Sequence, residues 1–226
     1  MMYYRPQEPE NEQARKKTSL TDEEIIRYIF AKESFKSKPY DSKDGKWTIG
    51  YGYVIRDKDN KDNPNEVYVD KGGADFANGI TEEQAVSLAM DKHNKLVNMS
   101  RNVLKQNGID FDELPSDIQT GIKIFSYGGW LNKDYSKGFI EALKKGKESG
   151  FDKESRLALA QNYGRGMEST LGGVKHGANV IRGMLMGEVD FDVLMKDVDD
   201  GKFYSNEMKQ NYSQFDNTNI NTGKIN

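Results

Sequence analysis

The amino-acid sequence predicts an α+β protein in which one short β-rich stretch interrupts a largely helical chain. Its 226 residues correspond to one or two domains at the usual size of about 150 residues each. Residues 38–70 combine β-branched and aromatic residues with interleaved glycines, which is typical of strands. The flanking segments instead repeat apolar residues at helical spacing.

The first helix is expected directly after a polar N-terminal segment. Residues 1–19 carry prolines, glutamates and a basic run but no apolar period, so we expect a mobile arm there. Thr21 and Glu24 then form a capping box, in which each side chain bonds the backbone amide of the other residue. The apolar face that follows predicts a helix ending between Lys32 and Phe35.

The β-rich stretch begins after this helix. Its strongest part is Trp47–Ile55, which we expect to be a strand, with Glu66–Val69 as a candidate partner. The polar residues Asp57–Asn65 between them are interpreted as a solvated hairpin loop. Calcium binding is the alternative, but these acids lack the regular spacing and the distal glutamate of an EF-hand.

Helical signals return at Thr81. This residue forms a second capping box with Gln84, and the apolar period that follows predicts a helix to about Leu104. Further helices are predicted after a third capping box at Ser116 and Gln119, and around 136–145, 153–163 and 174–186.

After about Phe203 the chain becomes rich in asparagine. We expect residues 204–226 to be extended or disordered unless a partner holds them. The predicted organisation is therefore an arm over 1–19, one domain over 20–203 and a tail over 204–226.

The composition excludes several classes of protein. The chain has no cysteine, which excludes a disulfide scaffold, a thiol nucleophile and a thiolate zinc site. Its net charge of -3 argues against a nucleic-acid partner held by phosphate contacts. No apolar run approaches the roughly 18 to 20 residues of a transmembrane helix, and no signal peptide is visible. We therefore expect no cofactor, no metal, no nucleic acid and no membrane partner.

Three residues around the junction of the first helix and the strands are candidates for chemistry. Glu33 ends the predicted helix, and Asp41 and Thr48 follow it. Glycosidic cleavage needs one carboxylic acid to protonate the leaving oxygen and a second group to direct water or stabilise the cation. Glu33 and Asp41 could form that pair, but both lie amid lysines, where a solvated surface is the common alternative.

The residues around this junction also resemble a known family. The stretch covers residues 33–52 and has the sequence ESFKSKPYDSKDGKWTIGYG. It resembles the active-site signature of the phage-type lysozymes, glycoside hydrolase family 24. In that signature a glutamate is followed by a tyrosine, an acid or cysteine and a Thr-Ile-Gly-x-Gly segment. Weaker similarity extends the resemblance over residues 20–195, at 79–85, 124–130, 139–146 and 180–187.

The resemblance implies a fold, a reaction and site residues. It implies a small β-containing lobe, a mainly helical lobe and a cleft between them. The substrate is expected to be peptidoglycan, cut between N-acetylmuramic acid and N-acetylglucosamine. The implied roles are Glu33 as general acid, Asp41 as the water-directing carboxylate, Thr48 as the third catalytic member, and Tyr51, Tyr53 and Ser126 in substrate binding.

The chain departs from the family pattern at the second acid. The position nine residues after Glu33 holds Ser42, so Asp41 stands one residue early. A slip of one residue along a strand turns a side chain to the other face. We expect Asp41 and Thr48 to face the same side as Glu33; the alternative is that Ser42 takes that place.

Three functions remain open. The first is a monomeric muramidase, released from the host cytoplasm or carried in a virion. The second is a weakly active or inactive lysozyme-like component of a phage particle, attached to other virion proteins through its terminal segments. The net negative charge favours this second reading, because it removes the general attraction to an anionic wall. The third is a lytic transglycosylase, which needs only one acid.

Overall fold

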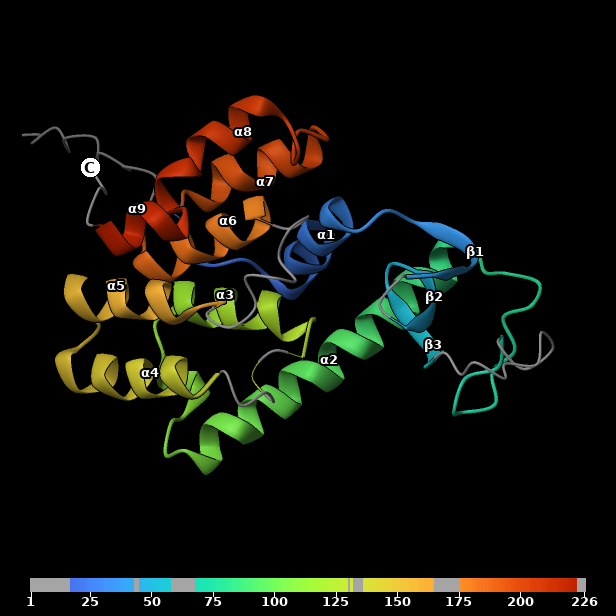
Figure 1. Cartoon of the computed structure of the whole chain (residues 1–226), viewed down its shortest axis with the longest axis horizontal. Coiled ribbons are helices and arrows are strands. Elements are labelled where there is room, and N and C mark those ends of the chain that lie inside the picture. The colour runs from blue at the N-terminus through green and yellow to red at the C-terminus, as the bar shows by residue number, and fades with distance from the viewer. Residues whose placement is uncertain are drawn as a thin grey trace, which may run out of the picture.

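The computed structural model of the chain describes residues 17–42, 45–57, 68–129, 131, 136–164 and 175–222. A small antiparallel sheet lies at one end, helices form the other end, and α2 runs between them (Figure 1). The α+β class is therefore confirmed. The elements in chain order are α1 (Asp22–Lys32), β1 (Lys36–Asp41), β2 (Lys46–Gly50), β3 (Tyr53–Asp57), α2 (Glu82–Gln106), η1 (Phe111–Glu113), α3 (Ser116–Ser126), α4 (Lys137–Ser149), α5 (Lys153–Asn162), α6 (Lys175–Met186), α7 (Phe191–Asp199), α8 (Asn206–Asn211), η5 (Ser213–Phe215) and α9 (Asn217–Thr222).

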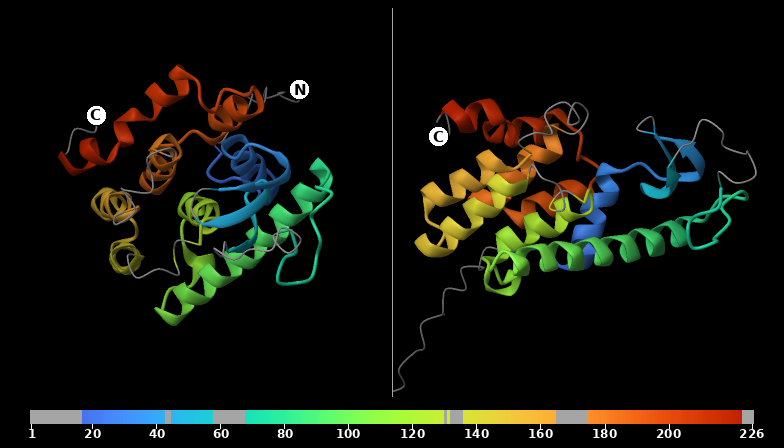
Figure 2. Two further views of the ribbon diagram at one scale, coloured as in Figure 1. Left: turned by 45° about the vertical axis from the view of Figure 1, so that its right-hand side comes forward. Right: turned by 60° about the horizontal axis from the view of Figure 1, so that its bottom comes forward.

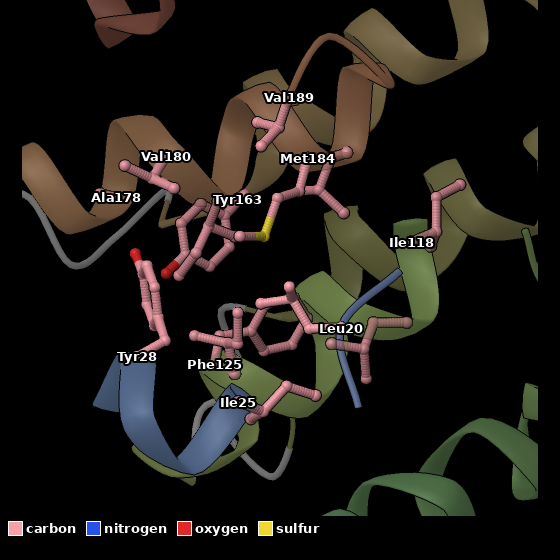
Figure 3. Packing of buried hydrophobic residues seen from close by; sticks show 14 of the residues in the cluster. Leu20, Ile25, Tyr28, Ile118, Phe125, Tyr163, Ala178, Val180, Met184 and Val189 are labelled. Carbon is pink, nitrogen blue, oxygen red and sulfur yellow. The ribbon is translucent and has the colours of Figure 1, made fainter. Parts of the chain in front are cut away.

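Helix α1 begins and ends where the sequence predicts. The Thr21 hydroxyl accepts a hydrogen bond from the Glu24 amide, and the Glu24 carboxylate accepts one from the Thr21 amide. Its buried face packs into the helical core, where Ile25 and Tyr28 lie beside Phe125 of α3 (Figure 3). Contacts begin before the predicted boundary at residue 20, since Lys17 forms an ion pair with Glu24.

The three strands form one sheet in the order β1-β2-β3, with both pairs antiparallel. The single strand expected over Trp47–Ile55 is in fact two strands with a tight turn between them. Gly50 and Gly52 both have positive φ, at 63° and 82°, a conformation that favours glycine and allows the chain to reverse. Val69 makes only an isolated bridge with Asp75. The partner of β2 is therefore β3, and the expected pairing with Glu66–Val69 is not found among the described residues.

Helix α2 connects the sheet to the helical part of the molecule, as the right-hand view of Figure 2 shows. The predicted capping box of Thr81 and Gln84 is present at its start. Its 25 residues span about 37 Å at 1.5 Å per residue. A buried face that includes Ala85, Ala89 and His93 runs along it, so one helix contributes to both ends of the molecule.

The C-terminal segment differs most from the prediction. Residues 206–222 form α8, η5 and α9 rather than an extended tail. Their apolar residues are buried in the main core, with Met208 and Phe215 almost fully covered. Phe215 packs so closely on α6 that a Cβ at Gly183 would lie 2.9 Å from its ring. The boundary predicted at residue 203 therefore cuts through the folded unit.

No helix in the described part of the chain combines the length and the apolar character needed to cross a bilayer.

Candidate active site at the junction of helix and sheet

Glu33 lies where the helical part of the molecule meets the sheet. It is the C-cap of α1, and its amide donates a hydrogen bond of 2.9 Å to the Ile29 carbonyl. Its extended backbone, with φ -104° and ψ 123°, leads the chain into β1. The side chain is 38% exposed, and its carboxylate lies 3.6 Å from the ammonium group of Lys32. The candidate acid is therefore partly buried and lies beside a cation.

The turn between β2 and β3 is held by three helices. The ring of Tyr51 stacks on Phe30 of α1, with centroids 3.9 Å apart, and its hydroxyl donates to Glu82 of α2 at 2.6 Å. The Tyr51 carbonyl accepts a hydrogen bond of 2.6 Å from the hydroxyl of Tyr127, which follows α3. Burial, together with Glu82, raises the pKa of Tyr51 to about 12. Tyr51 is buried, so it anchors the sheet to the helices and does not offer its ring to a substrate.

Lys92 of α2 completes this junction. Its ammonium group donates a hydrogen bond of 2.8 Å to the Gly52 carbonyl and lies 4.1 Å from the centroid of the Tyr127 ring. Burial lowers the pKa of Lys92 to about 8; the negative charge of Glu33 opposes that shift, and Lys46 and Lys32 add to it. No pattern in the sequence predicts this role, because a lysine in a polar part of a helix is usually solvated.

Tyr127 lies in the same electrostatic environment. Its pKa is raised well above the ordinary value by burial, and the charges of Glu33 and Tyr40 add to the shift. The charge of Glu33 therefore acts on both Lys92 of α2 and Tyr127 at the end of α3. This convergence makes the junction the candidate active site.

Asp41 and Thr48 lie on opposite faces of the sheet. In the β1–β2 ladder Tyr40 pairs with Thr48, and Asp41 pairs with Trp47. Directly paired residues share a face of an antiparallel sheet, and neighbours along a strand alternate. The expectation that Asp41 and Thr48 face the same side is therefore wrong. The register shifts between Lys36 and Tyr40, and this irregularity precedes the regular pairs that fix Asp41 on its face.

Ser42, directly after β1, lies on the face of the sheet that Thr48 occupies. Its amide and its hydroxyl both donate to the Lys46 carbonyl, at 3.1 and 2.9 Å, which extends the ladder by one residue. Alternation along β1 then gives Ser42 the same face as Thr48. Asp41 is exposed, whereas Ser42 is half-buried. Asp44, the other nearby acid, lies outside the described residues.

Thr48 has a buried side-chain hydroxyl that does not contribute to the stability of the fold. It is 4% exposed, and its hydroxyl oxygen has no hydrogen-bond partner among the described residues. A buried hydroxyl without a partner costs about 1 to 3 kcal/mol of stability. Such a group is typical of a site that receives a ligand or a water molecule.

Tyr53 and Ser126, the two remaining residues predicted to bind substrate, differ in their accessibility. Tyr53 donates its hydroxyl to Asp70 at 2.7 Å and lines a surface hollow of about 370 Å³ between β3 and α2, together with Leu88 and Lys95. Ser126 is fully buried, and its hydroxyl oxygen lies 2.7 Å from both the Ser100 hydroxyl and the Ile122 carbonyl. Tyr53 remains accessible to a substrate, but Ser126 does not.

Within the described residues, no three His, Cys, Asp or Glu side chains are arranged to hold a metal ion. Trp130 and most of the polar loop expected after Asp57 lie outside those residues. Comparison of the chain with models of protein families, with curated proteins and with solved structures gives no match.

Proposed function

We propose that this protein is a peptidoglycan hydrolase that cleaves the β-1,4 bond between N-acetylmuramic acid and N-acetylglucosamine, with Glu33 as its general acid. The observation that carries the proposal is the position of Glu33 at the junction of helix and sheet. Lys32 lies 3.6 Å from its carboxylate there, and the negative charge of Glu33 acts on both Lys92 and Tyr127. A protonated Glu33 would give its proton to the leaving glycosidic oxygen.

The second role in the reaction falls to hydroxyl groups rather than to a carboxylate. Thr48 has a buried hydroxyl with unused hydrogen-bonding capacity, and Ser42 shares its face. Ser42, which is half-buried, would hold a water molecule against the sugar, and the buried Thr48 hydroxyl would support that water from below. Hydroxyls orient water but do not take its proton as a carboxylate does, so we expect a slow enzyme.

A second candidate function is a weakly active or inactive lysozyme-like component of a phage particle. The observation that favours it is the exposed position of Asp41 on the face opposite Thr48. The packing of 206–222 into the core leaves residues 1–16 as the candidate segment for attachment to virion proteins. A net charge of -3 fits a protein that is delivered to the wall rather than attracted to it.

Lysis of purified cell walls, followed by turbidity, tests the proposal. Glu33→Gln should abolish lysis while changing the free energy of unfolding by no more than about 1 to 2 kcal/mol. The matched control is Glu148→Gln, an exposed glutamate in α4 far from the junction, which should lyse walls like wild type. Undiminished lysis by Glu33→Gln would refute the assignment of the acid.

Two further measurements separate the alternatives. Ser42→Asp adds a carboxylate on the face of Thr48 and should raise the rate of lysis, whereas Asp41→Asn should leave it nearly unchanged. A wild type that lyses no walls, with no gain from Ser42→Asp, supports the structural role. Anhydro ends on the products, instead of reducing ends, would identify a transglycosylase.

A further inference from the structure

The loop between α7 and α8 brings an exposed aromatic ring to the end of α1. Phe203 is 2% exposed and packs edge-to-face on Tyr28 of α1, with ring centroids 5.2 Å apart. The next residue, Tyr204, is 48% exposed, and its ring lies 4.9 Å from that of Phe203 at an interplanar angle of 84°. Phe203 therefore fixes the loop to the core, and Tyr204 remains at the surface.

The hydroxyl of Tyr204 fixes the other end of the side chain. It donates a hydrogen bond of 2.8 Å to the Lys32 carbonyl, in the residue directly before Glu33. Burial raises the pKa of Tyr204, and the negative charge of Glu33 raises it further. The hydrogen bond places the hydroxyl end of the side chain next to the residue that precedes the proposed acid.

We propose that Tyr204 is a saccharide-binding platform next to Glu33, on which one pyranose ring of the glycan strand stacks. This inference rests on the proposed function and adds a binding residue from the C-terminal segment. Sugar rings carry apolar C–H faces, and a flat aromatic surface offers the matching contact. Since Phe203 and Lys32 already hold the ring in place, binding costs little side-chain entropy.

Tyr204 is set apart from the other exposed apolar side chains of the described chain. The others are aliphatic or thioether groups without a flat face: Val54, Met90, Met99 and Val193. None of them is hydrogen-bonded to the end of α1. The alternative explanation is that Tyr204 only caps the carbonyl of Lys32. The two roles differ in which part of the side chain matters, the ring or the hydroxyl.

Binding to purified, insoluble peptidoglycan sacculi tests the platform. The assay uses the full chain carrying Glu33→Gln, at low temperature, and measures the bound fraction after centrifugation. Adding Tyr204→Ala should weaken binding about fivefold, as expected for the loss of one stacked ring. Adding Tyr204→Phe keeps the ring and should change binding less than about twofold. Val193→Ala, on the neighbouring helix, is the exposed apolar control and should bind unchanged.

The wild-type background gives a second readout. In otherwise wild-type protein, Tyr204→Ala should slow lysis at low wall concentration and keep most of the rate at saturating walls, since stacking contributes mainly to substrate binding. Unchanged binding by Tyr204→Ala, or equal losses for the alanine and phenylalanine variants, would overturn the platform. A Glu33→Gln protein that does not bind sacculi at all would overturn it too. If Glu33→Gln itself lyses walls normally, the proposed acid fails while the binding result for Tyr204 still stands.

Discussion

Replacement of Lys92 by methionine tests the electrostatics of the junction most directly. Methionine keeps a long, flexible stem but removes the ammonium group. Burial moves the pKa of Lys92 from 10.5 to about 8. At 1.36 kcal/mol for each unit of pKa, the charged form costs the folded state about 3 kcal/mol. The hydrogen bond to Gly52 and the contact with the Tyr127 ring hold the ammonium group in this position.

The sign of the pH dependence follows from these values. Above pH 8 the folded protein releases the proton of Lys92, while the unfolded chain keeps it until about pH 10.5. The free energy of unfolding attributable to Lys92 therefore rises with pH across this window. At pH 7 both states carry the proton and the folded state still bears this cost, so Lys92→Met should hold or raise stability there.

Urea unfolding at pH 7 and pH 9.5 provides the measurement. Between these values wild type should gain about 2 kcal/mol relative to Lys92→Met, because every other group titrates in both proteins. Lys95→Met, an exposed lysine on the same helix, should retain the wild-type pH dependence. Equal slopes for wild type and Lys92→Met would show that Lys92 is solvated and does not hold the turn.

Three other perturbations have defined outcomes. Burial lowers the pKa of His93 to about 4, so wild type should lose about 3 kcal/mol as pH falls from 6.5 to 4, and His93→Gln should remove most of that loss in thermal unfolding. Truncation after Ser205 removes the buried Met208 and Phe215 and should destabilise by more than about 3 kcal/mol, whereas truncation after Thr222 should retain cooperative unfolding. Thr48→Val should hold or raise stability, because it replaces an unpaired buried hydroxyl, yet should reduce wall lysis several-fold. Lysis equal to wild type would remove Thr48 from the site.

Local signals in the sequence were sufficient for the two helices that frame the site. The capping boxes at Thr21 and Thr81 involve residues three apart, so their hydrogen bonds are set by the first turn alone. The position of Glu33 followed from the predicted end of α1. These features depend on near neighbours, which a sequence displays directly.

Features that depend on distant contacts were not predictable in this way. The C-terminal segment has too few apolar residues to show a helical period, and its helices are short. Its stability comes from packing, as when Phe215 approaches Gly183 of α6. Lys92 and Tyr204 likewise join the site by donating hydrogen bonds to distant backbone carbonyls. Gly52 lies 40 positions from Lys92 in the sequence, and Lys32 lies 172 positions from Tyr204. Every residue has a backbone carbonyl, so the acceptor of such a hydrogen bond cannot be recognised from the residue types in the sequence.

The register of the sheet decides how the second acid can be interpreted. For Asp41 to share the face of Thr48, β1 would have to slip by one residue against β2, and every paired side chain of β1 would then change face. Strand β2 cannot move to meet it, because Ile49 is fully buried beneath the sheet and the following turn is held by α1, α2 and α3. A shift of the strands would therefore disrupt the packing of the sheet, whereas substitution of Ser42 by aspartate would supply the carboxylate without moving either strand. If Ser42→Asp accelerates lysis, the site has the geometry of a two-acid hydrolase with one acid absent. If it does not, while Glu33 remains essential, the chemistry needs one acid only, and the product ends then decide between a slow hydrolase, which leaves reducing ends, and a transglycosylase, which leaves anhydro ends.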